Sequence, residues 1–161
     1  MQGDSRRQSV KFWISAWLPV AVGIGIIMLE STKWFGADHT SGPLRLLWEA
    51  IFGTVSNARW NLIHFLIRKS GHFMGYGFLG AAWLRAWWMT LPHSHFLEDT
   101  FLALMGTALV ASLDELHQSY LPNRTGSVSD VLLDCCGAIA LQLAVYLWLR
   151  LFRPRTLAHG S

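Results

Sequence analysis

The stretch that decides the fold is residues 100–120, TFLALMGTALVASLDELHQSY. Its first two-thirds are almost wholly apolar, and as a helix it is long enough to cross the roughly 30 Å hydrocarbon core of a bilayer. Its last third carries Asp114, Glu115 and Gln118. Ionisable residues at such a depth are costly in lipid and generally mark a functional site. The stretch therefore predicts a membrane-spanning helix that ends in a polar site.

The composition of the whole chain agrees with a membrane protein. Of its 161 residues, 52% are hydrophobic and only 14% are charged, whereas soluble domains carry roughly 25% charged residues. The formal net charge of +3 comes without the basic and aromatic platform of a soluble nucleic-acid-binding domain. We therefore expect a single membrane domain over residues 1–161, with membrane lipids among its partners and no nucleic acid.

Three further apolar runs flank the deciding stretch, so we expect an all-α fold, a polytopic four-helix transmembrane bundle. The four predicted spans cover residues 12–29, 70–89, 100–120 and 129–152. No small-x-small cleavage site follows the first run, which favours a retained span over a signal peptide. Residues 58–67 mix Trp60 with other apolar and polar residues, which predicts a short interfacial helix before the second span. The rest is expected to be loop.

Basic residues flank both ends of the predicted bundle. They are Arg6, Arg7 and Lys11 before the first span, and Arg150, Arg153 and Arg155 at the end of the fourth. The positive-inside rule then favours cytoplasmic termini, although the first loop also carries Lys33, Arg45 and Arg59. In this orientation the polar residues of the last three spans converge at the outer end of the bundle.

Helical spacing gives each of those three spans a polar stripe. Residues three, four or seven apart share one helix face, and the stripes are Lys69, His72 and Tyr76; Asp114 and Gln118, with Glu115 beside them; and Asp130 and Asp134. A charged group facing lipid at mid-depth costs about 2.5–3.5 kcal/mol on insertion scales. The stripes should therefore face one another or a water-filled cleft.

Small residues favour close packing of these helices. Gly71, Gly75 and Gly80 lie on the second span, and Gly106 and Gly137 lie on the third and fourth. Without a side chain, each can bring a neighbouring helix close. We expect the glycines to be the points at which the helices approach each other.

The charges of the predicted cluster do not balance. Lys69 and Arg124 supply two positive charges, whereas four carboxylates, those of Asp114, Glu115, Asp130 and Asp134, supply negative ones. Protonated carboxylates, a bound divalent cation or a cationic group of a ligand would each correct the difference. The sequence leaves these three open, so we assign no metal ligands and name no cofactor.

The loop at residues 121–130, LPNRTGSVSD, is the second chemical clue. Ser127 or Ser129 can cap the fourth helix, whose free N–H groups attract anions. With Arg124 above it, that helix end can hold a phosphate or a carboxylate. In the alternative interpretation, Arg124 only neutralises Asp130 or Glu115, and the serine is only a cap.

Taken together, these motifs resemble the VanZ-like membrane protein family. The resemblance rests on the ordered series Lys-x-x-His-Phe-x-x-Tyr at residues 69–76, Asp-Glu-x-x-Gln at 114–118, Pro-x-Arg at 122–124 and Ser-x-x-Asp at 127–130. It implies a small, multi-pass protein of the bacterial cytoplasmic (inner) membrane. The family's namesake is associated with low-level resistance to teicoplanin, a glycopeptide antibiotic with a lipid tail.

Two positions depart from the family pattern. Gly75 stands where an acidic residue is often expected before the tyrosine, and Asp134 stands where Asn is common. The chain has thus lost a carboxylate on the second span and gained one on the fourth. A ligand shared with the family would be held differently here.

The resemblance favours a binding function. We expect the outer-leaflet site to bind a lipid-linked envelope precursor or a lipoglycopeptide through Lys69, His72, Tyr76, Asp114, Glu115, Gln118, Arg124, Ser127, Asp130 and Asp134. The alternative is an intramembrane hydrolase or transferase acting on a lipid-linked phosphoryl or acyl group. Its catalytic candidates are Glu115 or Asp114 as general base and His72 as acid or base, but no nucleophile motif supports it. In a third reading, the buried ion pairs only fix the helix order.

Overall fold

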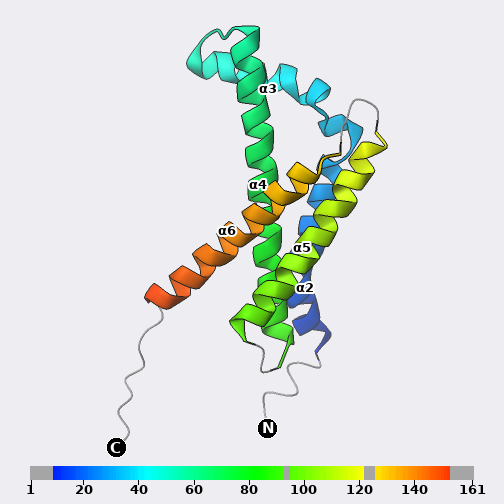
Figure 1. Cartoon of the computed structure of the whole chain (residues 1–161), viewed down its shortest axis with the longest axis vertical. Helices are drawn as coiled ribbons and strands as arrows, with labels where there is room; N and C mark the ends of the chain where they lie inside the picture. The colour runs from blue at the N-terminus through cyan, green and yellow to red at the C-terminus, as the bar shows by residue number, and fades with distance from the viewer. Residues whose placement is uncertain (1–8, 93–94, 122–125, 153–161) are drawn as a thin grey trace, which may run out of the picture.

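The computed structural model describes residues 9–92, 95–121 and 126–152. These ranges contain one short 3-10 helix and five α-helices, in the order α2 (Val10–Glu30), η1 (Lys33–Phe35), α3 (Ala37–Phe52), α4 (Asn57–Thr90), α5 (Phe96–Ser119) and α6 (Val128–Phe152). Helices α2, α4, α5 and α6 run alternately up and down, so α2 begins and α6 ends at the same end of the molecule (Figure 1). The prediction of an all-α fold is confirmed.

Three of the described helices, α2, α5 and α6, are long and apolar enough to cross a membrane. Their bounds lie within a few residues of the predicted spans 12–29, 100–120 and 129–152. The remaining predicted span, 70–89, forms the second part of α4, and α4 is not among the helices that are apolar enough to cross a membrane by this measure. The structure therefore supports a membrane protein with three apolar spans.

Helix α4 runs without a break through 34 residues, so the prediction of a separate interfacial helix at residues 58–67 is wrong. Its N-cap is Ser56, and the helix contains no proline. A single glycine such as Gly71 costs a helix only about 1 kcal/mol relative to alanine, which is too little to end it. The stretch 58–67 is therefore the first part of a helix that continues into the bundle.

Helix α3 occupies residues that the sequence assigned to a loop, which is a second correction. The Gly42-Pro43 pair within it is a typical turn signal. Polar bonds attach α3 to the start of α4: Trp60 Nε1 donates to Ser41 Oγ at 2.8 Å, and Thr40 Oγ1 lies 3.1 Å from His64 Nε2. Four large apolar side chains of α3 are exposed: Leu46, Leu47, Ile51 and Phe52.

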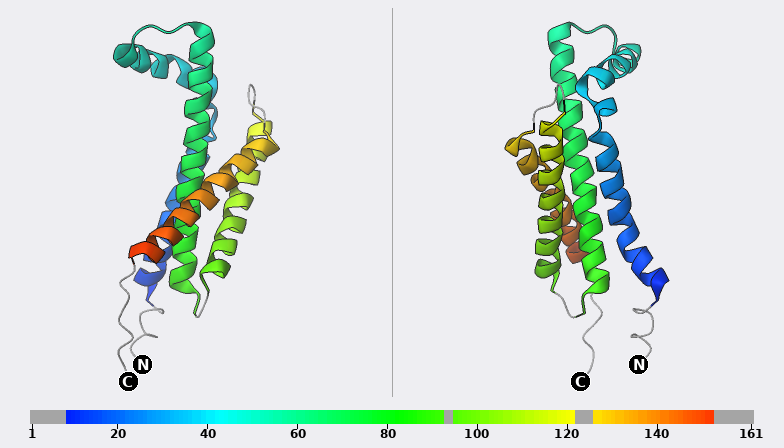
Figure 2. Two further views of the ribbon diagram at one scale, coloured as in Figure 1. Left: turned by 60° about the vertical axis from the view of Figure 1, so that its left-hand side comes forward. Right: turned by 90° about the vertical axis from the view of Figure 1, so that its right-hand side faces the viewer.

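The α4–α6 seam is the close crossing between those two helices, and small residues make it possible. Figure 2 shows α6 crossing α4 at a steep angle. A Cβ at Gly80 would lie 2.7 Å from the Cβ of Ala138, and a Cβ at Gly77 would lie 3.1 Å from the carbonyl oxygen of Gly137. A Cβ at Gly137 would overlap the carbonyl of Phe73. No larger side chain fits here, so the predicted role of Gly80 and Gly137 agrees with the structure.

Helix α2 is attached to the far half of α4 by a bond that a proline makes available. Pro19 lies inside α2 and has no N–H, so the carbonyl of Ser15 one turn earlier lacks its helical donor. Arg85 Nη1 donates to that oxygen at 2.8 Å and approaches the carbonyl oxygen of Ala16 at 3.3 Å. Trp17 also packs edge-on against Trp83 and Trp87 of α4, whose rings stack on each other.

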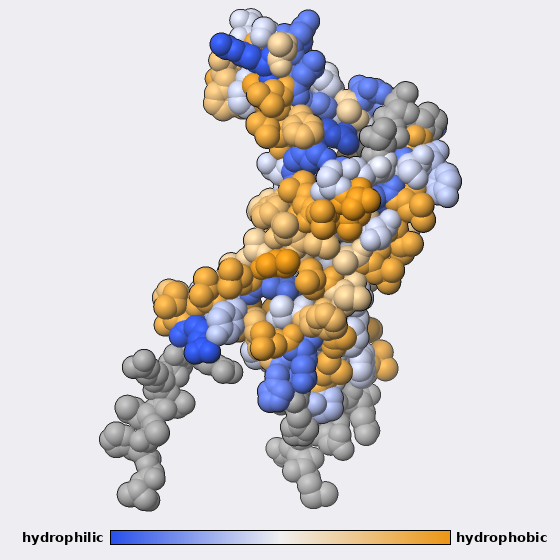
Figure 3. All heavy atoms as spheres, viewed as in Figure 1, coloured by the Kyte–Doolittle hydropathy of each residue, from blue (hydrophilic) through white to orange (hydrophobic). Residues whose placement is uncertain are grey.

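The distribution of apolar and hydrophilic residues on the surface is typical of a membrane protein. Apolar side chains cover most of the middle of the face shown in Figure 3, whereas hydrophilic residues gather toward its two ends. Large apolar residues of α5 and α6, such as Leu109, Leu116 and Leu132, are more than half exposed. Contiguous exposed apolar surface of this extent is rare on soluble monomers.

Candidate functional site

The predicted polar stripes meet where α4, α5 and the start of α6 come together, in the upper half of the bundle in Figure 1. We call the four residues His72, Asp114, Glu115 and Asp134 the acidic cluster. Asp114, Glu115 and Asp134 are buried, and His72 is half-buried. The prediction that the stripes turn inward agrees with this arrangement.

Asp114 is held by donors from two helices. The hydroxyl of Tyr76 on α4 and the amide of Gln118, one turn along α5, each donate to Asp114 Oδ2 at 3.0 Å. Tyr76 is only 2% exposed and Gln118 only 6%. Two donors on one oxygen fix the orientation of the carboxylate and leave its second oxygen outside these bonds.

Glu115 binds the start of α6. The backbone N–H of Ser127 donates to Glu115 Oε2 at 2.8 Å, and Ser127 caps the helix because its carbonyl accepts from the N–H groups of Asp130 and Val131. A Cβ at Gly126 would overlap the carbonyl of Glu115, so only glycine allows this approach. The predicted anion-attracting helix end is therefore occupied by a carboxylate of the protein itself.

Lys69 and Asp130 form an ion pair that links α4 to the first turn of α6. The Lys69 ammonium also lies 5.4 Å from the centre of the Phe65 ring. Both partners of the pair remain partly accessible, with side chains 31% and 19% exposed. The pair stands at the rim of the site and is more exposed than the three buried carboxylates of the acidic cluster.

His72 faces Asp134 across the α4–α6 seam. The His72 Nδ1 atom lies 3.5 Å from Asp134 Oδ1, a distance that allows an ion pair but exceeds an ordinary hydrogen bond. Asp134 is fully buried, with 0% exposure. Asp134 is thus the most deeply buried member of the cluster.

A polar cleft leads from the underside of α3 to the acidic cluster. Its outer part, about 150 Å³, is lined by Glu30, Phe35, Thr40, Leu44, Arg68, Gly71 and His72. Its inner part, about 20 Å³, adds Gly75, Tyr76, Asp114 and Gln118 among its lining residues. A Cβ at Gly71 or Gly75 would meet nothing within 4 Å. These two glycines therefore keep the cleft open and do not bring helices together, contrary to the prediction.

An apolar groove reaches the same cluster from the other side, between α2 and α5. It has a volume of about 290 Å³ and is lined by Ile24, Ile27, Met28, Ser31, Val110, Leu113, Asp114 and His117. Ser31 Oγ lies 3.1 Å from His117 Nδ1 and joins the two helices at the polar end of the groove. Groove and cleft share Ile27, Ser31 and Asp114.

The structure thus brings together most of the predicted site residues. Nine lie in or beside the site: Lys69, His72, Tyr76, Asp114, Glu115, Gln118, Ser127, Asp130 and Asp134. Arg124 lies outside the described residues. Glu30, Ser31 and His117 were not counted among the site residues in the sequence analysis, although all three are polar residues at the same ends of predicted spans as the stripes.

Comparisons with known proteins identify the family of the chain. A family model described as VanZ/LLP1 matches residues 15–150 and so covers all the apolar spans almost completely. Neither a curated protein nor a solved structure matches the chain. The matched region includes every described residue of the cleft, the groove and the acidic cluster.

Proposed function

This chain belongs to the VanZ/LLP1 family, and we propose that it binds a lipid-linked or lipidated envelope molecule at the outer leaflet of the bacterial cytoplasmic membrane. One observation carries the proposal: the polar cleft and the apolar groove meet at Asp114. An amphiphile can place its polar head in the cleft and its hydrocarbon chain in the groove. A purely polar ligand would have no use for the groove.

The groove has the size and lining of a ligand site. Its volume of about 290 Å³ is close to the lower end of small-molecule pockets, about 300–1,000 Å³. Most of its lining residues are apolar, while Ser31, Asp114 and His117 are polar. This combination suits an acyl or prenyl chain whose first polar atoms lie near Asp114.

The proposed membrane placement uses α4 as a fourth span. With 34 residues, it is about 51 Å long at 1.5 Å per residue. Residues 70–89 then cross the hydrocarbon core, and the part that precedes them projects beyond it. The basic flanks at Lys11 and Arg150 favour cytoplasmic termini, which puts the acidic cluster near the outer leaflet.

Helix α3 then lies at the outer membrane surface. Its polar residues Thr40 and Ser41 bond to α4, and its apolar residues Leu46 and Phe52 are 73% and 67% exposed. A helix that is held to its protein by polar bonds and leaves large apolar side chains exposed suits an interfacial position. In this placement α3 covers the mouth of the polar cleft.

Binding to the full-length protein in lipid nanodiscs tests the proposal. Teicoplanin is compared with its deacylated core, and undecaprenyl phosphate is compared with inorganic phosphate. At least one of the two tailed probes should bind at least tenfold more tightly than its tail-less partner. Equal affinity within both pairs, or no binding of either tailed probe above empty nanodiscs, would contradict the proposal.

A matched pair of variants at Gly75 connects that binding to the cleft. Since a Cβ here meets nothing within 4 Å, Gly75→Ala should leave binding unchanged, while Gly75→Leu should block the cleft and weaken binding of the tailed probe at least tenfold. Both variants should fold, because each replaces glycine by a better helix former. Unchanged affinity in Gly75→Leu would place the head group elsewhere.

A susceptibility assay addresses the physiological side of the proposal. We expect a teicoplanin-sensitive Gram-positive host to gain low-level protection from the wild-type protein and none from Gly75→Leu, at matched membrane abundance. No protection from abundant wild-type protein would exclude the antibiotic phenotype for this chain and favour a lipid-linked precursor as its ligand.

The neighbouring positions of His72 and Glu115 favour a second candidate function. Their ligand atoms lie within 4.8 Å of each other, and Glu115 Oε1 is buried without a hydrogen-bond partner, which is suitable geometry for general acid–base catalysis on a lipid-linked phosphoryl or acyl group. Glu115→Gln distinguishes the two functions. It should abolish turnover by an enzyme but reduce ligand binding only partially.

A further inference from the structure

The acidic cluster contains buried polar atoms without hydrogen-bond partners. His72 Nδ1, Glu115 Oε1 and both carboxylate oxygens of Asp134 are buried and have no hydrogen-bond partner. Glu115 is 5% exposed and Asp134 is 0% exposed. Buried polar atoms without hydrogen bonds cost free energy and are rare in native structures. Their concentration at one point indicates that a component of the site is missing from the protein chain alone.

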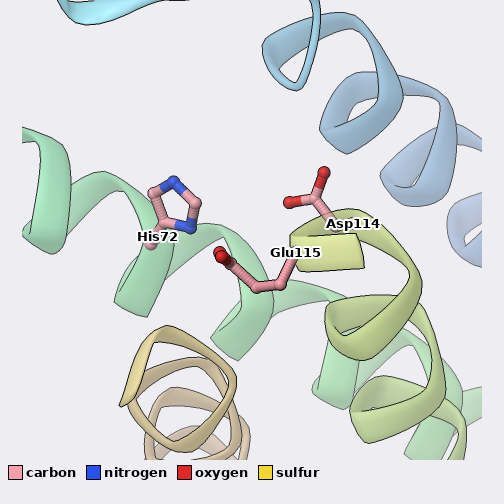
Figure 4. Close-up of side chains that lie close together, drawn as sticks. All are labelled: His72, Asp114 and Glu115. Atoms are coloured by element: carbon pink, nitrogen blue, oxygen red, sulfur yellow. The ribbon is translucent and has the colours of Figure 1, made fainter. Parts of the chain in front are cut away.

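The cluster has the geometry of a metal-ion site. One ligand atom from each of His72, Asp114 and Glu115 can be chosen so that all three lie within 4.8 Å of one another, and Figure 4 shows the three side chains converging. An ion with bonds of about 2.0–2.2 Å to nitrogen and oxygen separates its ligand atoms by about 3–4 Å. Small side-chain rotations would therefore close the cluster around one ion.

We propose that His72, Asp114 and Glu115 bind one divalent transition-metal ion. Asp134 lies beside this site, with its Oδ1 atom 3.5 Å from His72 Nδ1. An imidazole nitrogen together with carboxylate oxygens suits Zn²⁺ or Mn²⁺, whereas Mg²⁺ and Ca²⁺ prefer oxygen ligands alone. No metal ligands were assigned in the sequence analysis, and the proposed site follows only from the structure. It does not depend on the proposed binding of an amphiphile.

The residues around the cluster support this assignment. Tyr76 and Gln118 bind Asp114 Oδ2, and the N–H of Ser127 binds Glu115 Oε2. Hydrogen bonds to one oxygen of a carboxylate are typical of the outer shell that orients metal ligands. Each of these two carboxylates thus has one oxygen tied to the protein and the other available to an ion.

The charge of the cluster also favours a cation. Lys69 is already paired with Asp130, and three carboxylates, those of Asp114, Glu115 and Asp134, share the interior with His72. A dication would offset two of these negative charges. The inner cleft beside them has a volume of about 20 Å³, enough for about one water molecule. An ion bound here keeps one coordination position open to the cleft, where a phosphate or carboxylate oxygen can bind.

Metal analysis of the purified full-length protein tests the proposal. The protein is stripped with a chelator, loaded with Zn²⁺, Mn²⁺ or Mg²⁺, and passed over a desalting column before its metal content is measured. We expect one equivalent of Zn²⁺ or Mn²⁺ per chain and no retained Mg²⁺. Absence of retained Zn²⁺ and Mn²⁺, as expected if shared protons neutralise the carboxylates, would overturn the proposal.

Matched variants locate the ion. Glu115→Gln preserves shape but removes a charged ligand, so metal affinity should fall at least tenfold. Glu98→Gln changes an exposed carboxylate at the other end of the same helix and should retain wild-type affinity. Equal affinity in Glu115→Gln and Glu98→Gln would overturn the assignment of Glu115.

A spectroscopic signature keeps the test independent of stability. Pulsed electron paramagnetic resonance of bound Mn²⁺ should show coupling to a directly bound imidazole nitrogen, and this coupling should disappear in His72→Gln. A bound ion without nitrogen coupling in the wild-type protein would overturn the proposal. Repeating the nanodisc binding assay with chelator present separates the two proposals, because loss of metal and loss of amphiphile binding are then measured independently.

Discussion

The α4–α6 seam and the α2–α5 groove are built from the same kind of apolar helix, yet one is closed and the other open. At the seam, Gly80 and Gly137 leave no room for even a methyl group. At the groove, Met28 and Leu113 border a volume of about 290 Å³. The acidic cluster lies between the two. The comparison indicates that the closed seam fixes the position of the carboxylates, while the open groove gives a ligand access to them.

The largest effect is expected at the closed seam. Gly137→Leu would drive a side chain into the backbone of Phe73, and overpacking of this kind costs about 3 kcal/mol or more. Thermal unfolding in detergent should show a strongly lowered Tm or no folded protein. Gly71→Ala, at a position with nothing within 4 Å, is the control and should unfold like the wild type. A normal Tm for Gly137→Leu would mean that the seam is not tightly closed.

The next effect is expected at the open groove. Leu113→Trp should fill it and weaken binding of the tailed probe at least tenfold, which corresponds to about 1.4 kcal/mol. Leu116→Trp is the matched control: the two leucines are 56% and 53% exposed on the same helix, but only Leu113 lines the groove. Nanodisc titrations measure both variants. Equal weakening by the two would remove the distinction between groove and lipid-facing surface.

A smaller effect is expected where α2 is attached below the groove. Arg85→Met removes the donor to the Ser15 carbonyl and should lower stability by about 1 kcal/mol. In a Pro19→Ala background the backbone N–H at position 19 can serve that carbonyl, so the same Arg85→Met change should cost less. A double-mutant cycle of unfolding free energies measures the coupling. Strict additivity would show that Arg85 does not compensate for the proline.

The smallest effect concerns α3, which covers the cleft. Burial lowers the pKa of His64, and the Arg68 charge adds to this, so the docked state favours the neutral ring. Docking through Thr40 should therefore be strongest above the free histidine pKa of about 6.5 and weaken as the pH falls below it. Hydrogen exchange of α3 at pH 7.5 and 5.5, corrected for intrinsic rates, measures this, and His64→Gln should remove the pH dependence. Equal protection of α3 at the two pH values in the wild-type protein would contradict this prediction.

The sequence predicted the apolar spans and the three polar stripes because both depend on helical periodicity, which is local. The stripe of Lys69, His72 and Tyr76 is an example. Its spacing places the three side chains on one helix face, and the cost of exposing polar groups to lipid indicates that this face packs against other helices. The opposite roles of Gly75 and Gly80 were not predictable. Spacing places a glycine on a face but does not tell which neighbour, if any, approaches it.

Two other features depended on contacts between distant segments. Helix α3 was missed because the Gly42-Pro43 pair is locally a turn signal, and the bonds from Ser41 and Thr40 to α4 appear only in three dimensions. The pairing of the Ser127 N–H with Glu115 likewise joins two helix ends that the sequence describes separately. The sequence indicated where the fourth helix begins, but it did not identify Glu115 as the group that binds there.

Photo-crosslinking tests the central claim most directly. Undecaprenyl phosphate carrying a diazirine on its chain is irradiated with the full-length protein in nanodiscs, and the modified residues are mapped by mass spectrometry. We predict adducts concentrated at Met28, Val110 and Leu113 in the groove and suppressed by excess unlabelled probe. Adducts spread equally over exposed α6 residues such as Leu132 and Leu147, with no suppression, would contradict the account of an open groove that serves the acidic cluster.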